Sequence, residues 1–151
     1  MANINFYLTT SLATLTHAPQ CLLRITAPTN QRIAVLGVDV GLRDDTPTTS
    51  PFEFAWKVIS TIETKTDDFT ARAQDRSLDE TIQGTFVGYN TAGYTEPTYT
   101  SVLCYFSLHQ QGSMQWRPPF ELIVKGGESL GFCYTGSTLD TPVNFTVYCS
   151  E

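Results

Sequence analysis

Few residues in this chain are of types that do acid–base or nucleophilic chemistry, and they stand far apart. The two histidines, His17 and His109, are separated by most of the sequence, and His109 alternates onto the outer face of an expected strand. Of the carboxylates, only Asp39 and Glu53 fall inside strongly patterned strands, and both alternate outward. Glycoside hydrolysis needs two carboxyl groups across a cleft, one of them in an apolar pocket that raises its pKa. No such pair is indicated, so we expect no catalytic residue and no enzyme activity.

The sequence gives little support for a metal site. Four cysteines at positions 21, 104, 133 and 149 lack the C-x-x-C spacing of zinc and thioredoxin-type sites. Each lies in an expected strand or at its end, so we expect buried, reduced thiols. The acidic pairs Asp44-Asp45 and Asp67-Asp68 could contact calcium, but the EF-hand spacing is absent. We therefore expect neither a metal nor another cofactor.

The elements that must position any site are strands. A chain of 151 residues is long enough for one domain with a sizeable hydrophobic core and too short for two domains that each have one. Threonine, a β-branched residue that favours strands, is the most abundant residue type. Residues 32–42 alternate with a period of two, which predicts a half-buried strand with Leu36 and Val40 on its apolar face and Gly37 and Asp39 on the other.

A second strong strand, 52–62, has large aromatic residues on one face and should form the centre of the core. Shorter runs complete the set, at 4–8, 21–27, 85–87, 102–108, 114–116, 122–124, 130–134 and 143–149. Most of residues 63–101 reads as a long loop insertion, in which a short helical turn near 77–82 or a surface loop fits equally well. About eight strands and no convincing helix predict a single all-β domain over 1–151, an antiparallel β-sandwich or jelly roll.

The charge of the chain argues against two classes of partner. The formal net charge is −6, and the nine Lys and Arg residues are scattered singly. Binding to nucleic acid needs cations that displace counterions from phosphates, and the same acidity opposes adhesion to anionic membranes. The sequence shows neither a basic secretory leader nor an apolar run of about 20 residues. We expect synthesis in a cytoplasm, with no nucleic-acid and no membrane partner.

Two segments are suited to contact a partner. In Trp116-Arg117-Pro118-Pro119-Phe120, two prolines fix φ and remove two N–H donors, so the strand must leave its ladder there. Trp116 can cap the end of the core, join a contact surface, or do both. At the N-terminus, Ile4-Asn5-Phe6-Tyr7-Leu8 is short, apolar and suited to pair with the sheet edge of a partner. We expect an extended arm over residues 1–10.

Three tyrosines, Tyr89, Tyr94 and Tyr99, fall in a stretch rich in Gly, Pro and Thr at 88–101, which predicts an exposed loop. Tyrosine is enriched at binding surfaces. These side chains are therefore candidate contacts for a sugar or a protein, and the alternative is that they pack within the loop itself.

The order of these pieces resembles the small decoration (cement) proteins of tailed-phage capsids. The first part of the resemblance is Thr26-Ala27-Pro28 with a strand-like run on each side. The second is an aromatic strand, a glycine turn, Trp116 with Pro118-Pro119, then Gly126-Gly127-Glu128 and a closing strand that ends in Glu151. The resemblance is best over residues 102–151, and residues 63–101 show little that matches.

The resemblance implies a jelly-roll protomer that forms a homo-trimer on the outer surface of the virion. The partner would be the major capsid protein, and the trimers would bridge neighbouring capsomers and stabilise the shell. The expected contact residues are Ile4, Phe6, Tyr7, Leu8, Trp116, Arg117, Pro118, Pro119 and Phe120. An acidic protein suits the outer face of a shell, away from the packaged DNA.

The alternative is a carbohydrate- or host-binding β-sandwich on the virion surface. It would use Tyr89, Tyr94, Tyr99 or Trp116 as a stacking platform. The two functions are compatible, because a decoration protein can carry exposed host-binding loops.

Overall fold

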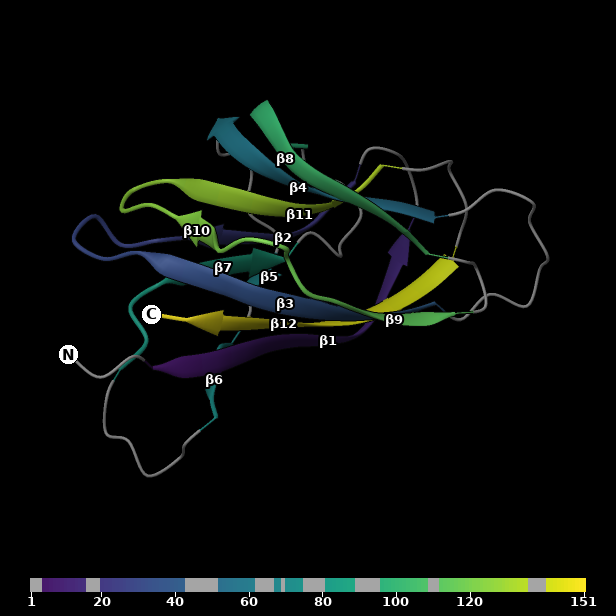
Figure 1. Cartoon of the computed structure of the whole chain (residues 1–151), viewed down its shortest axis with the longest axis horizontal. Coiled ribbons are helices and arrows are strands. Elements are labelled where there is room, and N and C mark those ends of the chain that lie inside the picture. The colour runs from purple at the N-terminus through teal and green to yellow at the C-terminus, as the bar shows by residue number, and fades with distance from the viewer. Residues whose placement is uncertain are drawn as a thin grey trace.

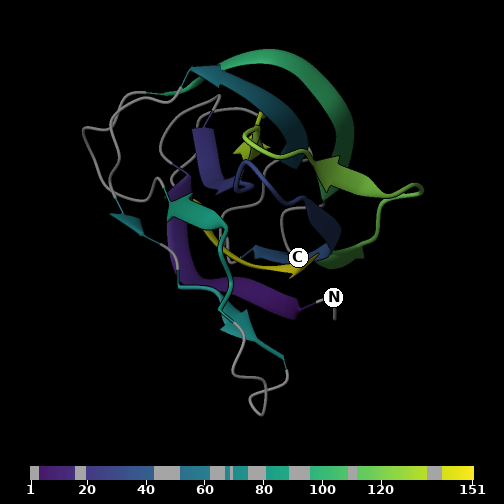
Figure 2. The ribbon, with the colours of Figure 1, turned by 90° about the vertical axis from the view of Figure 1, so that its left-hand side faces the viewer.

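The described part of the chain forms two antiparallel sheets that pack face to face (Figure 1, Figure 2). The computed structural model describes residues 4–15, 20–42, 52–61, 67–68, 70–74, 81–88, 96–108, 112–135 and 141–151, apart from the side chains of 11–15, 67–68 and 141. Within these ranges there are twelve strands and no helix. The all-β sandwich predicted from the sequence is therefore confirmed.

Each sheet has six strands. The order in sheet A is β10 (Leu122–Val124), β3 (Ile33–Leu42), β12 (Thr141–Ser150), β1 (Asn5–Leu15) and β6 (Arg72–Ala73), with β9 (Ser113–Trp116) also paired to β3. The order in sheet B is β5 (Asp67–Asp68), β7 (Thr85–Gly88), β2 (Gln20–Thr26), β11 (Ser129–Tyr134), β4 (Phe52–Thr61) and β8 (Thr98–Leu108). The first four long strands alternate between the sheets, so each sheet is assembled from distant parts of the chain.

Aromatic side chains fill the space between the sheets, as the pattern of residues 52–62 predicts. Phe54 in β4 stacks on Phe132 in β11 and on Phe106 in β8, with ring centroids 5.5 Å apart in both pairs. Trp56 also packs on Phe132, at 5.0 Å, and none of its surface is exposed. Burying each such ring stabilises the fold by roughly 1.5–3 kcal/mol, so β4 and β11 form the centre of the core.

A bulge in β3 overturns the predicted placement of Leu36. Tyr148 of β12 pairs with Gly37 and the next residue, Cys149, pairs with Val35, which leaves Leu36 without a partner on β12. The extra residue reverses the alternation, so that 43% of Leu36 is exposed. A sequence with a period of two gives no sign of such a shift, because residues on both sides of it are apolar.

The segment predicted to be a long loop insertion contains strands. β5 and β6 are edge strands that were not expected, and β8 begins at Thr98, within the stretch expected to be an exposed loop. β7 corresponds to the run expected at 85–87. Alternation along the expected run 102–108 predicts that Val102, Phe106 and Leu108 face inward, but register shifts between β8 and β4 leave 40% of Val102 exposed. Residues 77–80 of the suggested helical turn lie outside the described residues.

Residues 4–10, the described part of the expected arm, do not form a free arm, and residues 1–3 lie outside the described residues. β1 pairs with β12 along most of its length and with β6 on its other side. Phe6 and Leu8 have no exposed surface and belong to the main core. Ile4 and Glu151 exchange backbone hydrogen bonds of 2.9 and 3.0 Å, which hold the two ends of the described chain together. The alternation of Phe6 and Leu8 therefore buries this segment in its own sheet.

Candidate functional site: the outer face of sheet A

Two glycines shape the outer face of β3. Gly37 and Gly41 lie on either side of Asp39, and each is covered by a side chain from a neighbouring segment. Arg117 lies across Gly37, and the side-chain amide of Asn144 lies across Gly41. A Cβ at either glycine would collide with the covering side chain. These glycines therefore let polar side chains lie flat on the sheet.

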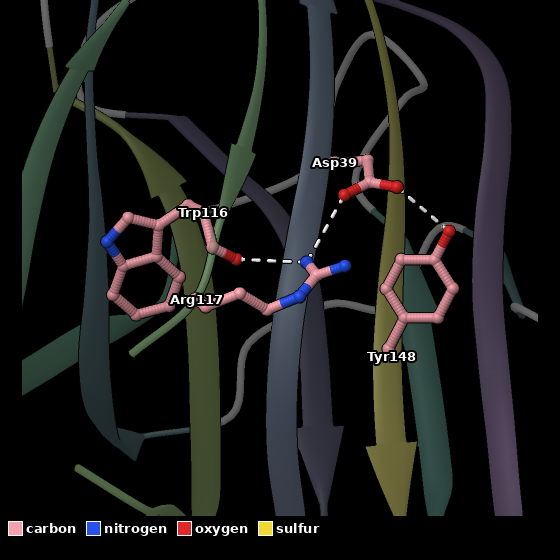
Figure 3. Close-up of polar contacts among 4 residues, drawn as sticks. All are labelled: Asp39, Trp116, Arg117 and Tyr148. Atoms are coloured by element: carbon pink, nitrogen blue, oxygen red, sulfur yellow. Dashed lines mark hydrogen bonds and ion pairs between the residues drawn. The ribbon is translucent and has the colours of Figure 1, made fainter. Parts of the chain in front are cut away.

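Asp39 joins three segments of the chain on this face (Figure 3). Its Oδ1 accepts a hydrogen bond from Arg117 Nη1 at 3.2 Å, and its Oδ2 accepts one from the Tyr148 hydroxyl at 2.9 Å. Arg117 Nη1 also donates to the Trp116 carbonyl at 3.2 Å, and its guanidinium carbon lies 5.2 Å from the centroid of the Tyr148 ring. The hydrogen bond to Asp39 is the main cause that raises the pKa of Tyr148. These contacts of Arg117 fix the direction in which the chain continues after the end of β9.

The segment that follows Trp116 forms an exposed corner. β9 ends at Trp116 opposite Val38, and β10 begins at Leu122 opposite Val35, so residues 117–121 bridge a gap of only two residues on β3. The exposed fraction is 58% for Phe120 and 43% for Leu36, which lies in that gap. Leu36 and residues 117–120 are called the corner below. Its two exposed apolar side chains project beside a polar face.

Trp116 itself belongs to the core. Its ring stacks on Phe106 of sheet B, with centroids 5.2 Å apart and an angle of 15° between the rings. It is half-buried and packs against the main core, so the core-capping interpretation is correct for this residue. Pro118 is also half-buried, whereas Arg117, Pro119 and Phe120 are exposed. Of the predicted contact segment, only these last three are open to a partner.

The other predicted contact residues are less accessible. Ile4, Phe6 and Leu8 are buried, and only Tyr7, half-buried, lies on the outer face of sheet A, opposite Tyr148 in the register of β1 and β12. Tyr99 is half-buried in β8 on sheet B and its hydroxyl is engaged by Glu96 and Cys133. It packs locally and is not an exposed loop contact. Tyr89 and Tyr94 lie outside the described residues.

A shallow groove of about 340 Å³ runs along the same face, on the other side of Asp39 from the corner. Thr9 and Thr146 share a hydrogen bond of 3.0 Å between their hydroxyl groups on one side of it. The full lining is Thr9, Thr10, Asp39, Val40, Gly41, Ser113, Met114, Gln115, Asn144, Phe145 and Thr146. The exposed side chains among these are mostly amides and hydroxyls, which suit hydrogen bonding to a neutral polar ligand.

The described residues offer no assembled metal or acid–base site. Among them, no three His, Cys, Asp or Glu side chains gather where they could hold an ion. Asp39 lies on the outer face of sheet A, whereas Glu53 lies in β4 of sheet B, so these carboxylates do not share a cleft. His17, His109 and Asp44-Asp45 lie outside the described ranges. Nor is any helix long and apolar enough to cross a membrane found in the part of the chain that is described.

Comparisons with known proteins give no information on the outer face of sheet A. No protein-family model, no curated protein and no solved structure matches this chain. What the sequence did not reveal is that Asp39, Arg117 and Tyr148 meet. The alternating glycines beside Asp39 were the available signal, since they mark a strand over which other side chains pass closely.

Proposed function

We propose that this chain is a structural virion protein that binds the outside of an assembled phage capsid and stabilises the shell. It acts as a homo-trimer that bridges neighbouring capsomers through the major capsid protein. The sequence resemblance over residues 102–151 supports this function. The structural observation that supports this function most is the corner. There Phe120 and Leu36 expose apolar side chains, and the hydrogen bond from Arg117 to Asp39 holds the segment in place.

The corner has the properties of a contact surface. Single exposed apolar residues are common, but two large ones at one corner of a sheet are typical of an interaction site. The ion pair between Arg117 and Asp39 and the two prolines restrict the segment before binding, which lowers the entropy lost on contact. The polar groove and Tyr7 would lie at the rim of such an interface.

Contact between copies is assigned to the edge of sheet B. Residues 5–10 of the expected arm pair with β12 in their own sheet, so they are not a free strand that could cross to a neighbour. β8 is the last strand of sheet B and lies at the outer side of its layer (Figure 1). It has no charged residue or proline between Thr98 and Leu108, and Leu103 and Tyr105 are 38% and 62% exposed. Such an edge is open to pairing with another strand.

The mechanism is mass action. A protein that binds the assembled shell and not its separated subunits stabilises the shell by its free energy of binding. Three linked copies add avidity without a new kind of contact. Many modest contacts then resist the outward pressure of the packaged genome.

The double variant Leu36→Ser, Phe120→Ser tests the corner. We expect it to fold as the wild type does, because both side chains are exposed, and to lose at least tenfold in affinity for expanded phage shells in a co-sedimentation assay. Lys125→Ser, which changes an exposed residue beyond β10, is the control and should bind as the wild type does. A double variant that saturates the shells at wild-type concentrations would disprove the assignment.

The groove favours a second candidate function, carbohydrate or host binding. Its amide and hydroxyl groups match the hydrogen-bonding groups of a neutral saccharide, although Trp116, one of the four stacking residues expected from the sequence, stacks on Phe106. Glycan-array binding that is lost in Asn144→Ala and kept in the corner variant would support this function.

A further inference from the structure

Two cysteines that are far apart in sequence face each other on sheet B. Cys21 in β2 and Cys133 in β11 are paired across neighbouring antiparallel strands, next to a bulge that leaves Leu22 without a partner on β11. Together with Ile59 and Val87, and with Tyr99 packed against them, they form a small cluster separate from the main core. Neither cysteine has any exposed surface.

The geometry of this pair fits a disulfide. Opposite residues of a regular antiparallel pair have Cα atoms about 4.5–5.5 Å apart, inside the range of about 4.4–6.8 Å that a disulfide spans. The bulge at Leu22 interrupts the regular ladder here, so the positions of the two sulfur atoms carry the argument. Gly131 leaves the space between the two side chains open. A Cβ at Gly131 would lie 3.2 Å from Cys133 Sγ and 3.3 Å from Cys21 Sγ, so both sulfur atoms crowd the same point.

The Cys133 thiol lies on a chain of hydrogen bonds along which its proton can move. The Cys133 thiol donates to the Tyr99 hydroxyl at 3.4 Å, and that hydroxyl donates to the carboxylate of Glu96, a half-buried residue. The Cys21 thiol instead donates to the Leu23 carbonyl at 3.6 Å. Burial raises the pKa of Cys21 and that of Tyr99, which keeps both groups neutral. The Lys57 ammonium lies 4.7 Å from the centroid of the Tyr99 ring and adds positive charge beside this chain of hydrogen bonds.

We propose that Cys21 and Cys133 form a redox-active dithiol, which a small-molecule disulfide oxidises to a cross-strand disulfide between β2 and β11. Cys133 passes its proton through Tyr99 to Glu96, and its thiolate attacks one sulfur of the oxidant. The S–S bond of the oxidant breaks and one thiolate leaves. Cys21 then loses its proton and attacks the Cys133 sulfur of the mixed disulfide, which releases the second thiolate. The two cysteine sulfurs lose two electrons, and the two released thiolates take up the two protons.

The product would link the two central strands of sheet B and close a loop from residue 21 to residue 133. A loop of this length restricts the unfolded chain strongly, so oxidation should raise the thermal midpoint by about 5–15 °C. The reaction needs the segment around Glu96 and Tyr99 to move aside for the oxidant. It should therefore be slower than the reaction of an exposed thiol.

The test is incubation of the purified native protein with oxidised glutathione, followed by intact-mass measurement and peptide mapping without reductant. We expect a loss of two hydrogen atoms and a single cross-linked peptide pair that joins Cys21 to Cys133. The other cysteines are the matched controls, since Cys104 is more exposed than the pair and Cys149 is buried in the main core. Cys104→Ser and Cys149→Ser should leave the cross-link intact, and Cys133→Ser should abolish it.

The proton path from Cys133 through Tyr99 to Glu96 is tested by the rate of disulfide formation. Tyr99→Phe and Glu96→Gln should slow disulfide formation about tenfold while the final yield stays the same. If the native dithiol stays reduced while the thiols of the urea-unfolded protein are consumed, the proposal is wrong. A cross-link through Cys104 or Cys149, or equal rates in the Tyr99 and Glu96 variants and the wild type, would overturn the pairing or the proton path respectively.

Discussion

At the scale of single residues, Asp39 is the side chain that organises the outer face of sheet A. It accepts hydrogen bonds from residues 78 and 109 positions away in the sequence. The exposed ion pair with Arg117 should contribute less than about 1 kcal/mol to stability. Its larger effect is positional, because it holds the guanidinium over Gly37 and Tyr148 and so sets the start of the corner.

The substitution Asp39→Asn should flatten the alkaline dependence of stability. The hydrogen bond to Asp39 raises the pKa of Tyr148 in the folded state above the value of about 10 in the unfolded chain. This contribution to the free energy of unfolding is therefore complete below about pH 10 and is lost as the pH rises through the folded pKa. Guanidinium unfolding between about pH 9 and about pH 11 should show a steeper fall for the wild type than for the variant.

Tyr148→Phe removes the titrating group and serves as the control, since it should give the same shallow slope as Asp39→Asn. Parallel curves for all three proteins would show that this hydrogen bond does not couple to folding.

The sequence revealed the composition of this site and not its assembly. Alternation placed Gly37 and Asp39 outward, and the two prolines indicated that the chain leaves its ladder after Trp116; both features are found. The meeting of Asp39 with Arg117 and Tyr148 depends on which strands pair, and local periodicity carries no information about pairing. The pairing of Cys21 with Cys133 could not be predicted for the same reason, because it also depends on which strands are neighbours.

At the scale of elements, strands with one strongly apolar face were predictable and their irregularities were not. The large aromatic residues of β4 are buried in the main core, as the alternation of residues 52–62 predicts. The bulge at Leu36 and the shifts along β8 follow from neighbouring strands and from turn geometry, which a single strand does not encode. The polar strands β5 and β6 lack an apolar face, so no pattern marked them.

The placement of β1 predicts a sharp contrast between two adjacent residues. Phe6→Ala should lower the free energy of unfolding by about 3–5 kcal/mol, because it leaves a cavity where the ring packs on Phe86 at 5.3 Å. Tyr7→Ala, on the outer face, should cost about 1 kcal/mol or less. Denaturant unfolding with equal slopes for both variants measures the difference. If the two costs are equal, β1 is not an integral strand and the free-arm interpretation returns.

At the scale of the whole molecule, the two outer faces of the sandwich differ. Sheet A presents a polar face with a groove and one apolar corner. Sheet B contains the small cluster around Cys21 and Cys133 and ends in the uncharged edge strand β8. A protein with a net charge of −6 repels its own copies over most of its surface. Association between copies is therefore favoured along edge strands that carry no charge, and β8, with 11 residues, is longer than the uncharged strands β9 and β10 at the edge of sheet A.

This argument predicts the effect of placing charge on β8. Light-scattering chromatography of the wild type should give a mass of about 50 kDa, three times the chain mass of 16.8 kDa, with and without reductant. Leu103→Lys combined with Tyr105→Lys should give monomers, because natural edge strands resist pairing when they carry lysine. Both side chains are exposed, so the variant should keep the unfolding midpoint of the wild type within a few degrees. A wild-type monomer at high concentration would argue against the trimer, and a trimeric lysine variant would move the interface to another edge.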